Sequence, residues 1–430
     1  MVSPITYILI IIPILLYITI FNSKPVDFVG LREIKTRREL FSVYNVSQTQ
    51  LGINVQIRND RADRLIQGYD PLLTHSISKS VKSFFLKLYF FVAGDPYKNL
   101  DEKTMCNGEL NKTEQELFDN FYKNYTLNSH PYIAVIGLTL VVTENEERNF
   151  IQEYVIKSLC IIEKYTRIKF VIFTNDEKQI KQCKDYNITY STTYSVNKFD
   201  VPILKSIIQN LEFHYNSWFY GYMNCDILLS MNIEQVLESI LQGIQSQIVK
   251  RETIIVLTRS NVIDTFFYNR TFNNDNEYMN ILIRSYHQSK YANPNAIDVF
   301  LGTKYTFTNS IFEDIVIGRY FIDGYILEYS LFREKSIDLI DITSSVYAIH
   351  IFGNESYKEK QINEDLLYNA MYFYSEEQAY GNYILFANLQ VSQKHNHYSI
   401  EPTSTPSYIQ YIKQNSLSYR CKYQYLKNHS

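Results

Sequence analysis

The sequence has 430 residues, of which 46% are hydrophobic and 15% aromatic, and its formal net charge is −3. A chain of this length and composition can bury one large core or two domains. No basic stripe or helix-turn-helix spacing stands out, so the composition argues against a nucleic-acid partner.

The first residues form a targeting segment. The run from Ile5 to Phe21 carries no charge, and as a helix it would span about 26 Å, enough for a thin membrane. A cleaved signal peptide is one interpretation, but no small-x-small cleavage site follows, which favours an uncleaved signal-anchor. The sequence thus predicts a cytosolic tail (1–4), a transmembrane signal-anchor (5–21) and a stem or accessory region (22–127).

The orientation of this anchor depends on the rest of the chain. Basic residues between Lys24 and Arg38 follow the span, and such residues usually stay cytosolic. Asn-x-Ser/Thr sequons, among them Asn45, Asn187 and Asn354, support a lumenal chain instead. We therefore expect a single-pass type II protein of the Golgi or ER membrane with its catalytic domain in the lumen.

From about residue 128, apolar runs typical of buried strands alternate with helical patterns. The expected strands are 132–142, 168–174, 188–193, the stretch through 218–229, and 253–258. The expected helices follow a capping box at Thr143 and Glu146, a short polar segment, a cap at Asp200, and Asn232. This alternation predicts an α/β fold, with a Rossmann-like, mostly parallel sheet covered by helices on both faces. Ligands of such sheets bind at the carboxyl ends of the strands.

One strand ends in an unusual polar pair, Asn224 and Asp226, after the apolar stretch that begins at Trp218. In a strand, residues two apart project to the same side, so we expect the amide and the carboxylate to point together. Two such oxygen ligands suit Mg²⁺ or Mn²⁺. The simpler alternative is that both residues cap the loop and the helix that follows Met231.

The distal half carries further motifs. They read VLTRSNV (256–262), IDVFL (297–301), IVIGRYFIDGYIL (315–327), IDLIDIT (337–343) and YAIHIFG (347–353). With GYMNCDILL, their order and spacing resemble a eukaryotic, membrane-anchored family of nucleotide-diphospho-sugar transferases with the GT-A fold. The resemblance covers about residues 130–355 and implies a catalytic domain at 128–355, followed by a C-terminal extension at 356–430 with no assigned task.

The resemblance implies a metal site and a catalytic site. The implied ligands of Mn²⁺ or Mg²⁺ are Asp226, Asn224 and His350, although a buried core histidine is the simpler interpretation of His350. Asp323 is implied as general base or acceptor contact, with Arg319 on the same helical face orienting it. A surface ion pair is the alternative for these two. Asp298 is implied as an acceptor contact or a helix cap.

The same resemblance implies a nucleotide site. The implied contacts are Asn175, Asp176, Lys205 and Arg259. One departure concerns the metal pair, because its first position is Asn224 and not Asp, and a neutral ligand holds a cation less firmly.

The leading hypothesis is a metal-dependent glycosyltransferase that moves a sugar from a nucleotide-diphosphate-sugar donor to a hydroxyl of a glycan, protein or lipid. The alternative is a catalytically inactive lumenal protein that binds glycans or a partner with the same fold. A glycoside hydrolase is a third interpretation, in which Asp226 and Asp323 would have to face each other about 5–9.5 Å apart.

Overall fold

The computed structural model describes residues 109–123, 130–263, 267, 270–291, 296–352, 368–372, 386–394 and 397–403. The predicted anchor at 5–21 and most of the predicted stem lie outside these residues. Within the described ranges, no helix combines the length and the apolar character that crossing a membrane requires. The membrane location therefore stays a prediction.

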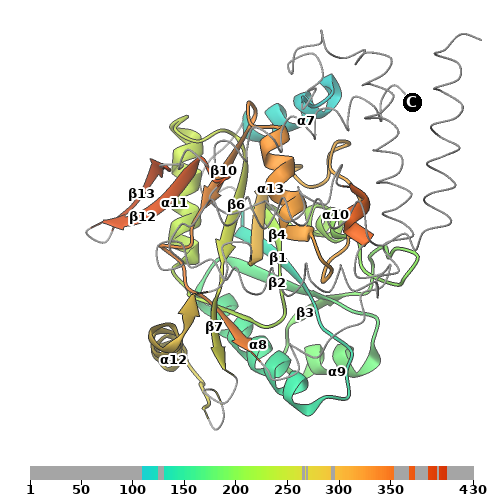
Figure 1. The fold of residues 1–430 in the computed structure, drawn as a ribbon, viewed down its shortest axis with the longest axis vertical. Coiled ribbons are helices and arrows are strands. Elements are labelled where there is room, and N and C mark those ends of the chain that lie inside the picture. The colour runs from blue at the N-terminus through green and yellow to red at the C-terminus, as the bar shows by residue number, and fades with distance from the viewer. Residues whose placement is uncertain are drawn as a thin grey trace, which may run out of the picture. The chain divides into compact units, whose positions relative to one another are not determined.

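A nine-stranded sheet forms the centre of the described chain, in the order β13-β12-β10-β6-β9-β4-β1-β2-β3 (Figure 1). Its strands are β1 (Tyr132–Thr139), β2 (Ile168–Phe173), β3 (Thr189–Ser191), β4 (Ser217–Met223), β6 (Glu252–Thr258), β9 (Ile297–Thr303), β10 (Ile337–Asp341), β12 (Leu389–Lys394) and β13 (His397–Pro402). Neighbours pair in parallel except at β9, which runs antiparallel between β4 and β6, and at the β12–β13 hairpin. The predicted α/β architecture with a mostly parallel sheet is confirmed.

A smaller sheet has the order β5-β11-β7-β8. Its strands are β5 (Ile227–Leu229), β7 (Ser260–Ile263), β8 (Lys290–Tyr291) and β11 (Ala348–Phe352). β5 continues the chain from β4, and β7 continues it from β6, so both strands leave the large sheet at its carboxyl edge. The small sheet thus collects side chains from distant segments beside that edge.

Helices cover both faces of the large sheet. Along β2, Ile168, Phe170 and Ile172 pack with one apolar cluster, whereas Val171 and Phe173 pack with another, as strand alternation requires. The first cluster includes residues of α7 (Lys112–Lys123), α8 (Glu146–Tyr165), α9 (Glu177–Asp185), α11 (Ile233–Gln245) and α12 (Asp275–Gln288). The second includes residues of α10 (Leu204–His214) and α13 (Ile322–Phe332), with Tyr372 of the short helix η3 (Tyr368–Tyr372) packed against it.

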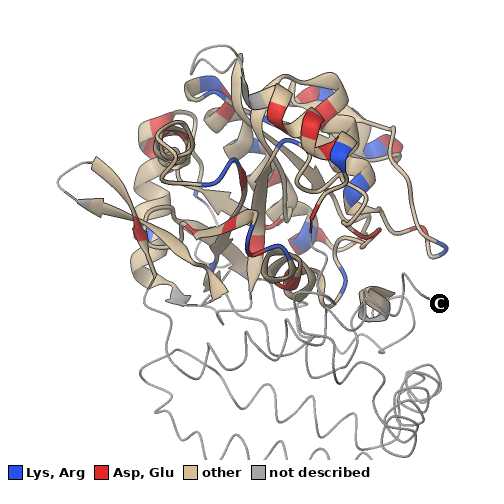
Figure 2. Ribbon diagram, turned by 90° about the horizontal axis from the view of Figure 1, so that it is seen from above, with Lys and Arg blue, Asp and Glu red and all other residues tan. Residues whose placement is uncertain are grey.

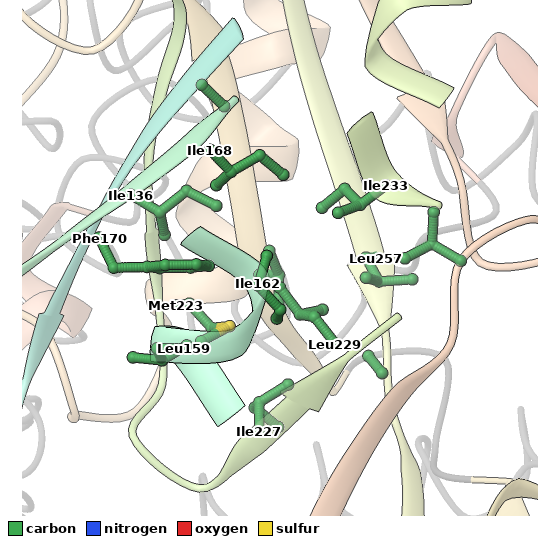
Figure 3. Close-up of a cluster of buried hydrophobic side chains, with 14 of the residues drawn as sticks. Ile136, Leu159, Ile162, Ile168, Phe170, Met223, Ile227, Leu229, Ile233 and Leu257 are labelled. Carbon is green, nitrogen blue, oxygen red and sulfur yellow. The ribbon is translucent and has the colours of Figure 1, made fainter. Parts of the chain in front are cut away.

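The close-up of the first cluster shows how α8 fixes the end of β4. Leu159 and Ile162 of α8 lie among Ile136, Phe170, Met223 and Ile227 (Figure 3). All of these side chains are almost fully buried. Acidic and basic residues are mixed on the surrounding elements (Figure 2). The strands before and after the Asn224–Asp226 turn are therefore held rigidly by the core.

Two predicted helix caps are wrong. Helix α8 is capped by the Asn145 side chain, which accepts a hydrogen bond from the Arg148 N–H, while Thr143 Oγ1 accepts from the Asn145 N–H. Asp200 does not cap α10, because it lies in a left-handed turn (φ 58°) and the residue before the helix is Ile203. Small polar residues form hydrogen bonds with the local backbone in turns as readily as at helix caps. Their spacing in the sequence therefore predicted the wrong cap residue for both helices.

Parts of the predicted stem and C-terminal extension join the same core. Phe118 of α7 is 3% exposed, and Glu114 accepts hydrogen bonds from Ser310. Strand β12 pairs in parallel with β10, and the Asn388 side chain joins Asp338 to the backbone of Leu339. The domain boundaries at 127 and 355 stay predictions, but the sheet and its cover draw on residues beyond both.

Candidate functional site

The candidate site lies at the carboxyl edge of the large sheet, where β4 and β6 end. Because β9 is antiparallel to both, its first residues reach the same edge. The Asn224 N–H donates to the Asp298 carbonyl (3.0 Å), and Thr258 is the register partner of Ile297. Polar residues that follow two strands and begin a third are thereby brought together.

Asn224 and Asp226 do not share one face of a strand. Strand β4 ends at Met223, Cys225 and Asp226 form a turn, and β5 begins at Ile227. The Asn224 amide donates to the Asp298 carboxylate, whereas the Asp226 carboxylate faces α8 and β11. The prediction that both side chains point to the same side of a strand is wrong, because the strand ends before Asn224.

Asp226 is buried at this site, at 7% exposed, as is Asp298 at 4%. Its Oδ2 lies 3.0 Å from Arg148 Nη1 and 3.3 Å from His350 Nε2, while its Oδ1 is buried without a hydrogen-bond partner. Burial alone would raise the pKa of this carboxyl, but His350, Arg148 and Arg259 outweigh burial and hold it well below its usual range. Asp226 is therefore ionised, with one oxygen still able to accept.

His350 reaches Asp226 through strand pairing. Within β11, His350 is the register partner of Ile227 in β5 and of Asn261 in β7. The Ile351 N–H also donates to the Asp226 carbonyl (3.0 Å). A central strand position of this kind fixes the direction of the imidazole, and it places His350 beside Asp226. Metal binding by these two residues stays a prediction.

Arg259 links the acids at this edge. Its Nη1 lies 2.7 Å from Asp298 Oδ1 and 2.6 Å from Oδ2, and its Nε donates to Asn261 (3.2 Å). Burial would lower the pKa of this guanidinium, but Asp298, Asp226 and Asp323 raise it. Arg259 therefore interacts electrostatically with all three acids, and its ion pair is with Asp298.

Asp323 lies in the first turn of α13, where its Oδ2 accepts the Ile297 N–H (3.2 Å). Burial, and then the neighbouring Asp298, raise its pKa to about 8. Near neutral pH this group can hold a proton or release it, which is the property a general base requires.

The remaining predicted residues lie in other surroundings. Arg319 precedes α13, and its guanidinium donates to the Gly318 carbonyl (3.1 Å), so the expected helical face shared with Asp323 is wrong. Asp176 caps α9 by accepting the Gln179 N–H (2.9 Å). Lys205 donates to the Phe312 carbonyl (3.0 Å), and Asn175 is exposed. Nucleotide binding by Asn175, Asp176 and Lys205 stays a prediction.

The side chains around Asp226 include oxygen and nitrogen donors for a divalent cation. Within the described ranges, no three His, Cys, Asp or Glu side chains gather in a way that could hold a metal. Asp226 nevertheless offers a buried, unpartnered oxygen, and His350 Nε2 lies next to the same carboxylate. Two protein ligands of this kind fit Mg²⁺ or Mn²⁺, because such ions keep waters and phosphate oxygens as their other ligands.

Sequence reasoning missed Arg148 and Gln152. The Gln152 amide accepts from the Val141 N–H (2.5 Å) and donates to the Val141 carbonyl (3.1 Å), which ties the loop after β1 to α8. The Cys225 thiol donates to the same Gln152 oxygen (3.7 Å). The sequence signal that could have indicated Arg148 is an arginine in the first turn of a helix that follows a buried strand.

The Asn145 cap supports both residues, which gives a testable expectation. Asn145→Ala should destabilise the fold by about 1 kcal/mol in urea unfolding, the usual cost of a lost cap. If the chain binds a nucleotide at this edge, as the family resemblance implies, the variant should also weaken that binding, because Arg148, whose N–H Asn145 accepts, lies 3.0 Å from Asp226. The matched control is Asn274→Ala, which removes the equivalent cap of α12 at Glu277. Equal nucleotide affinity in the two variants would contradict the expectation.

Comparisons with known proteins give weak matches of fold. No family model and no curated protein matches the sequence. CMP:2-keto-3-deoxy-manno-octonic acid synthetase, complexed with CTP, is 11% identical over 49% of this chain and 90% of its own, with a TM-score of 0.27. A 4-diphosphocytidyl-2C-methyl-D-erythritol synthase from Anaerococcus prevotii is 12% identical over 56% and 98%, with a TM-score of 0.22. Glucosyl-3-phosphoglycerate synthase from Mycobacterium tuberculosis, in complex with phosphoglyceric acid, is 7% identical over 66% and 93%, with a TM-score of 0.29. These proteins are nucleotidyl- or glycosyltransferases, and similarity at this level carries no argument about the chemistry of this chain.

Proposed function

We propose that this chain is a glycosyltransferase that moves a sugar from a nucleotide-diphosphate-sugar donor to a hydroxyl group of a glycan, protein or lipid. The observation that carries the proposal is the convergence of Asp226, His350, Arg259, Asp298 and Asp323 at the carboxyl edge of the sheet. That edge is where open α/β sheets bind their ligands. The membrane-anchored, lumenal setting belongs to the same proposal.

The convergent residues suit the two halves of the transfer. In the transfer, the acceptor oxygen bonds to the anomeric carbon of the sugar, the bond from that carbon to the diphosphate breaks, and the diphosphate leaves with the electron pair. Asp323, in its ionised form, takes the proton of the acceptor hydroxyl. Arg259 offsets negative charge at the diphosphate, since a guanidinium fork matches phosphate oxygens.

Asp226 and His350 would hold the divalent cation, Mn²⁺ or Mg²⁺. Bound there, it would stabilise the diphosphate as a leaving group. The neutral Asn224 amide is engaged with Asp298, so we assign it to positioning that acid. The acceptor contact predicted for Asp298 is compatible with this role, because Asp298 also fixes Arg259.

Nucleotide binding by the full chain tests the proposal. UDP, GDP and CMP are added in turn, with and without Mn²⁺, and thermal unfolding is followed. One nucleotide should raise Tm, and more strongly with Mn²⁺, because a ligand at 100 times its Kd stabilises the native state by about 2.7 kcal/mol. The matching nucleotide sugar should then be hydrolysed slowly in the presence of Mn²⁺. No shift with any nucleotide, together with no turnover, would reject the proposal.

A catalytically inactive glycan- or partner-binding protein is the second candidate. The observation in its favour is that Asp226 and Asp298 are each already paired with a guanidinium. In the same experiment, this candidate predicts either no nucleotide binding or nucleotide binding without turnover.

A further inference from the structure

Arg148 occupies a position that its own helix disfavours. It is the third residue of α8, and its backbone N–H is held by the Asn145 cap. The amino end of a helix carries partial positive charge, so a cation in the first turn is repelled by it. A local rule broken in this way is expected where function, and not helix stability, selects the residue.

The guanidinium of Arg148 points to the candidate site. Nη1 lies 3.0 Å from Asp226 Oδ2, and Nη2 donates to Cys225 Sγ at 3.8 Å. The side chain is 27% exposed, against 11% for that of Asp226. The Arg148 side chain is therefore partly exposed to solvent, while the carboxylate that it contacts is largely enclosed.

Asp226 needs a positive partner at all times. An ionised carboxylate buried without one is costly, and here Arg148 supplies the positive charge on Oδ2, which also lies 3.3 Å from His350 Nε2. A divalent cation on the same carboxylate would repel the guanidinium at this short distance. A cation bound at the unpartnered Oδ1 is thus opposed by the guanidinium on Oδ2.

We propose that Arg148 is a charge placeholder, which neutralises Asp226 when no divalent cation is bound and contacts the donor diphosphate when one is. The inference rests on the proposed function and adds a donor-binding residue to it. A guanidinium fork suits both partners, since carboxylate and phosphate oxygens accept from it in the same bidentate geometry. Arg148 then lowers the affinity of the site for the cation alone. It raises the affinity for a nucleotide once the cation is bound.

Two measurements on the full chain test this. Arg148→Gln should bind Mn²⁺ alone about tenfold more tightly than the natural chain in an electron paramagnetic resonance titration, because its competitor is removed. With Mn²⁺ saturating, the same variant should bind UDP, GDP or CMP, whichever the natural chain binds, about tenfold more weakly by calorimetry. Arg148→Lys should keep Mn²⁺ affinity near the natural value and still lose nucleotide affinity, because an ammonium lacks the fork.

The matched control is Arg167→Gln. Arg167 is 32% exposed and pairs with Glu234 and Glu238 of α11, so the variant removes a similar ion pair away from Asp226. It should change neither affinity. If Arg148→Gln does not fold, Arg148→Lys decides alone, and an unchanged nucleotide affinity there overturns the inference.

The outcomes separate the two proposals. If the natural chain binds Mn²⁺ and a nucleotide but Arg148→Gln binds both with unchanged affinity, the placeholder is wrong and the proposed function stands. If the natural chain binds neither, both proposals fall. Tighter Mn²⁺ binding combined with weaker nucleotide binding supports both.

Discussion

Asp226→Asn is expected to lower sugar transfer by roughly two to three orders of magnitude, because it removes the charged oxygen proposed to hold the cation. The amide has the same shape as the carboxylate, so the core around it should be preserved. Arg148 would lose its counter-charge, and a moderate fall in Tm is expected as well. Initial rates of donor turnover with Mn²⁺ and thermal unfolding of the same preparation measure the two effects.

Asp341→Asn is the control for this variant. Asp341 is the last residue of β10 at the same edge of the sheet, where its carboxylate accepts the Thr343 N–H (2.8 Å). The change removes a half-buried carboxylate to which we assign no part in the transfer, so turnover should stay within about twofold. Full turnover in Asp226→Asn, or an equal loss in both variants, would remove Asp226 from the chemistry.

Asp323→Asn is expected to lower kcat by about 10²- to 10⁴-fold, the usual contribution of a general base. Its pKa of about 8 also predicts that kcat/KM of the natural chain rises with pH, with the midpoint of the rise near pH 8. In the variant, the residual rate should lose this dependence. A residual rate with the same rise near pH 8 would assign the proton transfer to another group.

The same raised pKa has a consequence for stability. Between about pH 4 and pH 8, the unfolded chain releases the Asp323 proton while the native chain keeps it, so the free energy of unfolding falls as pH rises through this window. Asp323→Asn should remove this part of the fall in urea unfolding at several pH values. Glu212→Gln serves for comparison, because burial raises the pKa of Glu212 only to about 7, and its contribution should end there.

Much of the fold could be predicted because its signals are local. Strand β2 and helix α8 follow from continuous apolar runs and from residues at helical spacing such as Ile151 and Leu159. Boundaries were less certain, since β1 stops at Thr139 and the expected run to 142 continues as a loop tied down by Gln152. That hydrogen bond joins the loop after β1 to α8, and the spacing of residues in the sequence does not predict a contact between two separate elements.

The site was predictable only in part for the same reason. His350 meets Asp226 through the β5–β11 pairing, and the family resemblance could suggest this contact where spacing could not. The pairing of Arg259 with Asp298 arises because β9 enters the sheet in the reverse direction. Arg148 carried only a weak signal, since an arginine in a helix is unremarkable until its cap is located at Asn145.

The β12–β13 hairpin closes one side of the large sheet. Without it, the backbone N–H and C=O groups of β10 that face β12 would have no partner, and the apolar cluster that includes Ile340 and Ile342 would lose Val391, which is fully buried. An open, flat, apolar strand of this kind is a template for pairing with another chain. A shortened protein that ends at the last motif, near residue 353, would therefore be prone to aggregation even though all the residues proposed for catalysis were present.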